Sequence, residues 1–325
     1  MLERLLFALP FCLLMLPGNA PAQTPTQTWP TKPVRVIVPF PAGGAVDVLA
    51  RTVYDKVSAK LGQPFVIENR LGAGGTIGAA AAAKADPDGY TILVNSSSHT
   101  VAPALFASLP YDAAADFSAV IPLANLPTVL FVAGAKGYKN IGEFVTAAKA
   151  KPGAMSYGSG GVGNATHLNA ERFMLSAGFQ AVHVPFKGSP EALTEVLAQR
   201  IDFSFSTLLP GLQLLQDGKL KALAVSSSRR ATALPDVPTT TEAGFPDSDY
   251  NFWAGVMVPR KTDRAIVDIL YRQTTEALQL PDVQARIRAL GADPMAMTST
   301  EFDKLIADEV RINKELVKAA GIKVN

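Results

Sequence analysis

Short apolar runs alternate with amphipathic segments along most of the chain. Residues 34–40 are apolar and mostly β-branched, as is typical of a strand buried on both faces. A Pro/Gly loop follows, and apolar side chains then recur at helical spacing over residues 46–61 until Gly62 supplies a stop. This order recurs along the chain, and it predicts strands at residues 34–40, 65–70, 91–94, 129–133, 155–157, 181–186, 202–207, 222–225 and 251–259.

Helix boundaries are indicated by capping residues. An alanine-rich helix ends near residue 84, and another helix is expected over residues 168–175. Capping boxes or N-cap residues predict the starts of four more helices, at Asn140 with Glu143, at Ser189 followed by Pro190, at Thr262-Asp263, and at Thr298 with Glu301.

Repeated strand-loop-helix units predict an α/β protein with mainly parallel sheets and right-handed crossovers. The tripeptide Val-Pro-Phe occurs at residues 38–40 and again at residues 184–186, each time between a strand and a glycine-bearing helix entry. This suggests two halves built alike. Residues 229–249 are rich in Pro, Gly and Thr and are expected to connect the second half to the final strand and helices.

The composition is that of a globular protein with a sizeable core. The 325 residues are 48% hydrophobic and 18% charged, and 30 Lys and Arg stand against 28 Asp and Glu. The near balance of charge, without a basic run, argues against a nucleic-acid partner.

The N-terminus has the three parts of a signal peptide. A short region with one arginine precedes a nearly pure apolar run over residues 5–16, and Ala20-Pro21-Ala22 fits a cleavage site. We therefore expect residues 1–22 to be removed near Ala22. The single cysteine, Cys12, leaves with them, so the mature chain has no disulfide and no thiolate. An exported, cysteine-free chain fits the bacterial periplasm.

Two motifs partly match a dinucleotide site and a metal site, but each lacks a required residue. Gly158-x-Gly160-x-x-Gly163 follows a strand and precedes a helix, but the acidic residue expected of a dinucleotide site is missing after the next strand. His167 and Glu171 have i, i+4 spacing, but no third ligand stands at a suitable spacing. We expect no cofactor and no metal.

Serine hydrolase chemistry is the alternative that remains open. No G-x-S-x-G elbow occurs, but Ser159 and the serines at 96–98 lie in loops, and His99 and His167 are candidate bases. His183 lies inside an apolar strand, where a structural histidine is the better interpretation. The alternative reading is therefore a periplasmic hydrolase of small esters.

Small, donor-rich loops follow five predicted strands. In open α/β sheets, ligands bind at the carboxyl ends of the strands, so two such halves would form a cleft of N–H and hydroxyl donors with few acid–base groups. This arrangement suits a small anion held by hinge closure rather than by a reaction. The loops comprise residues 41–44, 96–99, 158–163, 187–189 and 206–207.

A set of motifs occurs in fixed order over nearly the whole mature chain. The motifs are Trp29-Pro30-x-Lys32-Pro33, Val38-Pro39-Phe40-x-Ala42-Gly43-Gly44-x-x-Asp47, Glu68-Asn69-Arg70-x-Gly72-Ala73-Gly74-Gly75-x-Ile77-Gly78, Pro87-Asp88-Gly89-Tyr90-Thr91, Tyr157-Gly158-Ser159-x-Gly161 through His167-Leu168, and Leu234-Pro235-Asp236-Val237-Pro238-Thr239 with Glu242-Ala243-Gly244. With these motifs in this order, the chain resembles the periplasmic substrate-binding proteins of tripartite tricarboxylate transporters, the Bug proteins.

The resemblance implies a two-lobed, type II periplasmic-binding-protein-like fold with a hinge between the lobes. Crossings near Asn125 and Tyr250 would divide the chain into lobe 1 (23–124 plus 250–325) and lobe 2 (125–249). It also implies a small carboxylate held largely by backbone donors and waters. Two departures from the family pattern concern Ser206, where an acidic or amide residue is common, and the turn at residues 187–190, which looks one residue short.

The sequence thus predicts a non-enzymatic, monomeric periplasmic receptor. It would capture a dicarboxylate, tricarboxylate, acidic amino acid or aromatic acid, and deliver it to membrane permease subunits or signal its presence. The predicted ligand-binding residues are Phe40, Ala42, Gly43, Gly44, Asp47, Ser96, Ser98, His99, Ser159, Gly160, Thr166, His167, Lys187 and Ser206.

Overall fold

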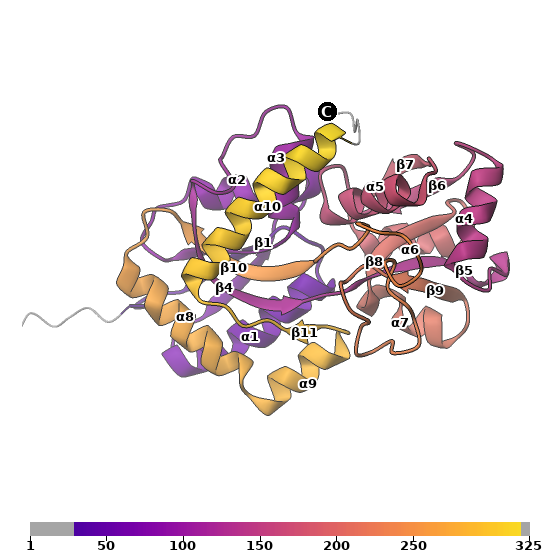
Figure 1. Cartoon of the computed structure of the whole chain (residues 1–325). Helices are drawn as coiled ribbons and strands as arrows, with labels where there is room; N and C mark the ends of the chain where they lie inside the picture. Colours follow the sequence, from indigo (N-terminus) through magenta and orange to yellow (C-terminus); the bar gives the residue numbers. More distant parts are fainter. Residues whose placement is uncertain (1–28, 320–325) are drawn as a thin grey trace, which may run out of the picture.

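The computed structural model describes residues 29–319. The predicted signal peptide, its cleavage site and Cys12 lie outside this range. Figure 1 shows two lobes side by side, each built on one sheet with helices packed against it. Between residues 29 and 319, no helix is both long enough and apolar enough to cross a membrane.

The first lobe contains a six-stranded sheet in the order β11-β4-β10-β3-β1-β2. Its strands are β1 (Val34–Val38), β2 (Phe65–Asn69), β3 (Thr91–Ser96), β4 (Phe117–Asn125), β10 (Trp253–Pro259) and β11 (Asp293–Pro294). Its helices are α1 (Ala45–Leu61), α2 (Thr76–Ala83), α3 (Ser98–Leu105), α8 (Arg264–Leu278), α9 (Pro281–Ala289) and α10 (Ser299–Ala319), with a 3₁₀ turn η1 (Ala73–Gly75) before α2.

The second lobe contains a five-stranded sheet in the order β7-β6-β8-β5-β9. Its strands are β5 (Thr128–Ala133), β6 (Ser156–Ser159), β7 (Val182–Pro185), β8 (Phe203–Thr207) and β9 (Leu220–Val225). Its helices are α4 (Ile141–Ala150), α5 (Ala165–Ala177), α6 (Ser189–Leu197) and α7 (Leu208–Gln216), with a 3₁₀ turn η2 (Gly134–Lys136) after β5.

In each sheet most strands run in one direction, as predicted, but the sheets are mixed, because at least half of the neighbouring strand pairs are antiparallel. β5 is antiparallel to both of its neighbours, and β10 is antiparallel to β3 and β4. These are the first strands after the chain passes from one sheet to the other. They start beside the opposite lobe and run away from it, whereas most of the other strands point their carboxyl ends toward the cleft. The sheet assignments fit crossings near Asn125 and Tyr250, and the exact lobe limits stay a prediction.

Both faces of each sheet are covered, which is why the strands read as apolar runs. In the first lobe, Val36 and Val38 pack toward Leu49 of α1, while Ile37 faces the cluster that contains Trp253 and Phe302. In the second lobe, one face packs around Phe144 and Phe173 and the other around Phe131 and Leu193. Burial on this scale supplies most of the stabilising free energy.

The sequence patterns missed several elements. β4 contains Pro122, which obscured its strand pattern; the register shifts on the partner strand at this point, between Ala254 and Gly255, so the ladder accommodates the proline. α3 and α7 were also not predicted. The expected single helix after Thr262 is two helices, because Pro281 begins α9 at its first turn.

Candidate functional site

A pocket lies between the lobes where four helices begin. Its lining includes residues from the N-cap or first turn of α1, α5, α6 and α7, together with the preceding loops. We call it the anion pocket. It is lined by Phe40, Pro41, Gly44, Ala45, Val46, Gly160, Asn164, Thr166, Gly188, Ser189, Pro190, Thr207, Pro210 and Phe252.

The anion pocket has no charged side chain in its lining, and four helix N-termini surround it. The first N–H groups of a helix have no partner within the helix, and the aligned peptide dipoles place partial positive charge there. In α1 the intrahelical bonds begin with the N–H of Val48, which donates to the carbonyl of Gly44. The backbone N–H groups of Ala45 and Val46, in the first turn, therefore have no acceptor within the helix. Several such turns around one pocket suit a carboxylate.

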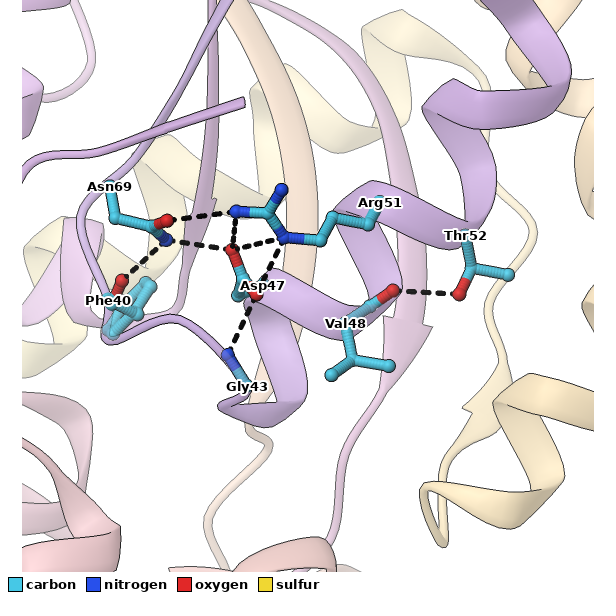
Figure 2. Close-up of polar contacts among 7 residues, drawn as sticks. All are labelled: Phe40, Gly43, Asp47, Val48, Arg51, Thr52 and Asn69. Carbon is cyan, nitrogen blue, oxygen red and sulfur yellow. Dashed lines mark hydrogen bonds and ion pairs between the residues drawn. The ribbon is translucent and has the colours of Figure 1, made fainter. Parts of the chain in front are cut away.

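Asp47 holds the loop that forms one wall of this pocket (Figure 2). Its Oδ2 accepts from the backbone N–H of Gly43 at 2.9 Å, and its Oδ1 accepts from Asn69 Nδ2 at 2.7 Å. The Arg51 guanidinium pairs with the same carboxylate at 3.0 Å. Asn69 also donates to the carbonyl of Phe40 at 2.9 Å, so one network fixes both ends of the loop.

The electrostatics keep Asp47 ionised. Burial alone would raise the pKa of this carboxyl, but hydrogen bonds from Arg51, Asn69 and Gly43, with the charge of Arg51, hold the pKa below its usual value. The side chain is 1% exposed and does not line the pocket. Its observed contacts are those of a positioning residue.

Ser98 and the helix it begins connect the two lobes. The backbone N–H of Ala165 in α5 donates to Ser98 Oγ at 2.9 Å, and Ser96 Oγ donates to the same oxygen at 3.0 Å. His99, by contrast, is buried in the first lobe. Its Nε2 lies 2.8 Å from the carbonyl oxygen of Ala113, and burial lowers its pKa to about 4. The structure does not bring His99 to the cleft.

Ser159 and the other two histidines form a cluster beneath the Gly160 loop. Ser159 Oγ lies 2.6 Å from His183 Nε2, and the rings of His167 and His183 stack with centroids 3.9 Å apart. Burial lowers the pKa of His183 to about 4, and burial with the neighbouring imidazole lowers the pKa of His167 to about 3. The predicted pairs of Ser159 with His99 or His167 do not form. Ser159 is 0% exposed.

The remaining predicted residues fall in different places. Gly160 and Thr166 line the anion pocket, with the Gly160 N–H donating to Thr166 Oγ1 at 2.9 Å. Ala42 and Gly43 are exposed on the loop, and Ser206 is buried with its hydroxyl donating to the carbonyl of Thr207. These three lie outside the pocket lining. Ser189 and Thr207, expected only as parts of donor-rich loops, also line the pocket, and sequence reasoning missed Asn164 and Phe252.

The position of Asn164 at the start of a helix could have been predicted from the sequence. It directly follows a glycine-rich loop and is the N-cap of α5, where its Oδ1 accepts from the N–H of Thr166 at 2.9 Å. Asparagine is among the preferred N-cap residues, so its position was readable from the sequence.

Residues 49–322 match the family model described as the tripartite tricarboxylate transporter family receptor. The chain belongs to this family. The protein BugT of Bordetella pertussis is 36% identical over 305 residues, which covers 93% of this chain and 94% of BugT. The resemblance expected from the motifs is confirmed.

Solved structures agree with this assignment. An R. palustris protein solved with adipate is 31% identical and superposes with a TM-score of 0.86, covering 91% of this chain and 100% of that one. MatC from Rhodopseudomonas palustris with bound malate is 31% identical with a TM-score of 0.84, covering 89% and 100%. The predicted two-lobed fold is confirmed, and the chain is a periplasmic solute-binding protein of this family.

Proposed function

We propose that the protein captures a small organic carboxylate in the anion pocket and delivers it to the membrane permease of a tripartite tricarboxylate-type transporter. One observation carries the proposal: turns from four helix N-termini line one pocket, and no charged side chain lines it. A carboxylate would be held by the N–H groups of Ala45 and Val46 and by the hydroxyls of Ser189 and Thr207. The family and the adipate and malate ligands of its relatives support this assignment.

The contacts between the lobes support capture by closure. A Cβ on Gly188 would lie 2.6 Å from Pro41 Cγ in the other lobe, and a Cβ on Gly74 would lie 2.3 Å from the carbonyl oxygen of Val162. The lobes therefore approach closely at glycines on both sides of the pocket. Sliding or hinging at these contacts would admit and then enclose a ligand.

Calorimetric titration of the mature chain with malate, adipate, citrate, glutamate and benzoate tests binding. We expect saturable binding of at least one of them and a loss of more than about tenfold in Gly44→Val, because the new side chain enters the pocket. Gly142→Val, on an exposed turn of α4, is the control. Absence of binding by all five would overturn the proposal. Uptake of the bound acid by cells with and without this chain tests delivery to the permease.

The hydrolase alternative has a geometric obstacle. Its nucleophile would be Ser159, whose hydroxyl is fully buried, and the serines of residues 96–98 are buried as well. We therefore propose a receptor and not an enzyme. Ester hydrolysis that disappears in Ser159→Ala while folding is retained would contradict this choice.

A further inference from the structure

A second cavity opens from the same cleft. It shares Phe40, Gly160 and Asn164 with the anion pocket and is also lined by both lobes. We call it the side pocket. Its other lining residues are Pro39, Leu71, Gly72, Ala73, Gly74, Gly75, Phe106, Gly161, Val162, Phe186 and Lys187.

The two cavities differ greatly in size. The anion pocket has a volume of about 40 Å³, and the side pocket has a volume of about 530 Å³. Because a single water needs about 10–15 Å³ measured in this way, the anion pocket holds little more than one carboxylate group. The rest of a ligand anchored there must extend elsewhere, and the side pocket begins at the residues the two cavities share. Its volume lies within the range of small-molecule sites, about 300–1,000 Å³.

The lining of the side pocket is apolar. Phe40, Phe106 and Phe186 line it from three different loops, together with Leu71 and Val162. Leu71 is 42% exposed, so the first lobe offers apolar surface that a ligand would cover. Such a lining stabilises a ring more than a hydroxylated chain, because the hydroxyl groups would lose their water without gaining partners.

Lys187 is the one charged residue that lines either cavity in the described part of the chain. Lys187 is exposed to solvent. Its backbone N–H donates to Glu191 Oε2 at 3.0 Å, which fixes the turn that carries it. Lys187 lines the side pocket next to Gly188 of the anion pocket, and its ammonium group provides a partner for a second negative charge.

We infer that the ligand is a dicarboxylate with a ring-sized apolar body, which lies in the side pocket while one carboxylate occupies the anion pocket and the other reaches Lys187. This inference rests on the proposed function and narrows its substrate class. The apolar surface that Phe40, Phe106 and Phe186 provide favours a ligand with a ring. Lys187 distinguishes the dicarboxylate from a monocarboxylate of the same shape.

Calorimetric titration with a benzenedicarboxylate, benzoate and malate tests the inference on the full mature chain. The benzenedicarboxylate should bind more than about tenfold tighter than malate, because its ring leaves water. Lys187→Met should weaken the benzenedicarboxylate about fivefold and leave benzoate unchanged, since the distal charge loses its partner. Leu71→Ser should weaken both aromatic acids and leave malate unchanged. Lys151→Met, at an exposed lysine of the same lobe, is the matched control.

The outcomes separate this inference from the proposed function. Tighter binding of malate than of the benzenedicarboxylate, or an equal effect of Lys187→Met on benzoate and the benzenedicarboxylate, would overturn the assignment of the side pocket and leave the carboxylate receptor standing. No binding of any acid, including the linear and tricarboxylic acids tested above, would overturn both.

Discussion

The backbone N–H of Ala165 donates a hydrogen bond of 2.9 Å to the hydroxyl of Ser98, and the two residues belong to different lobes. Each stands at the first position of its helix, Ala165 in α5 and Ser98 in α3. Both are nearly inaccessible to water. A bond of this kind forms only when the lobes are together, so it contributes to closure directly.

Ser98→Ala should weaken carboxylate binding about fivefold, because the closed form loses one buried hydrogen bond and leaves the Ala165 N–H without an acceptor. Titration calorimetry measures the loss, and small-angle scattering should show a larger radius of gyration in the presence of ligand. Thr146→Ala removes a surface hydroxyl of α4 and serves as the control. Unchanged affinity in Ser98→Ala would show that this bond does not support closure.

Gly188→Ala tests the contact between the lobes. The backbone of Gly188 is extended, with a φ of 176°, so alanine fits it without strain, but its Cβ would lie 2.6 Å from Pro41 Cγ. We expect stability within about 0.5 kcal/mol of the wild type and binding weakened about tenfold, because the clash occurs only on closure. Adding Pro41→Gly should restore part of the affinity.

Two comparisons make this test specific. Gly142→Ala changes a glycine that has no contact with the other lobe and should leave binding unchanged. Equal binding by Gly188→Ala and the wild type would mean that the ligand is held without this approach of the lobes.

Asp47→Asn should lower the free energy of unfolding by about 2 kcal/mol at pH 7, because a buried ionised acceptor of several hydrogen bonds is lost. The pKa of Asp47 is lowered in the folded chain. Its stabilising effect is therefore present above the unfolded value of about 3.9 and disappears as the pH falls through the folded pKa. Urea unfolding at pH 7 and pH 3 measures the difference.

A surface pair provides the control for Asp47. Arg264 and Asp268 form an exposed i, i+4 pair at 2.9 Å, and Asp268→Asn should change stability by less than about 0.5 kcal/mol. If the two substitutions had equal effects, the network around Asp47 would not be what holds the loop.

Burial of neutral histidines predicts a loss of stability in mild acid. Burial lowers the pKa of His99 from 6.5 to about 4. Between these values the unfolded chain binds a proton that the folded chain does not, so the free energy of unfolding falls as the pH falls from 6.5 to 4. For His99 the full effect is about 3 kcal/mol. His167 and His183 act in the same direction.

His99→Leu should reduce the slope of stability against pH in this interval, although it lowers stability at pH 7.5 by removing the bond to Ala113. Urea unfolding at a series of pH values between 7.5 and 4.5 measures the slope. Parallel curves for the variant and the wild type would show that His99 does not contribute to the acid sensitivity.

The helix starts that depend on capping residues were predicted correctly or to within one residue. Asn140 accepts from the N–H of Glu143 at 2.9 Å, and Asp263 accepts from the N–H of Ala265 at 2.8 Å, as the capping patterns required. Thr298 and Glu301 form the expected capping box. α6 begins at Ser189, one residue earlier than the predicted N-cap would place it.

The candidate site was predicted less completely. The loops at the strand ends do face a common cleft, and Phe40, Gly44, Gly160 and Thr166 line the anion pocket. His99, however, was assigned to the ligand because it follows a strand-end loop, and the fold instead buries it against Phe117. Spacing along a loop does not reveal which side of the loop faces the core.

The strand-loop-helix units, the helix caps and the family could all be predicted from the sequence. These depend on residues a few positions apart, whose contacts are fixed once the local backbone forms. Three contacts could not be predicted without the fold: Asp47–Asn69, Ser159–His183 and Ser98–Ala165, whose members stand 22, 24 and 67 positions apart. Such pairs depend on which strands become neighbours and on how two lobes meet. That outcome is set by the packing of the whole core, and no short segment of the chain encodes it.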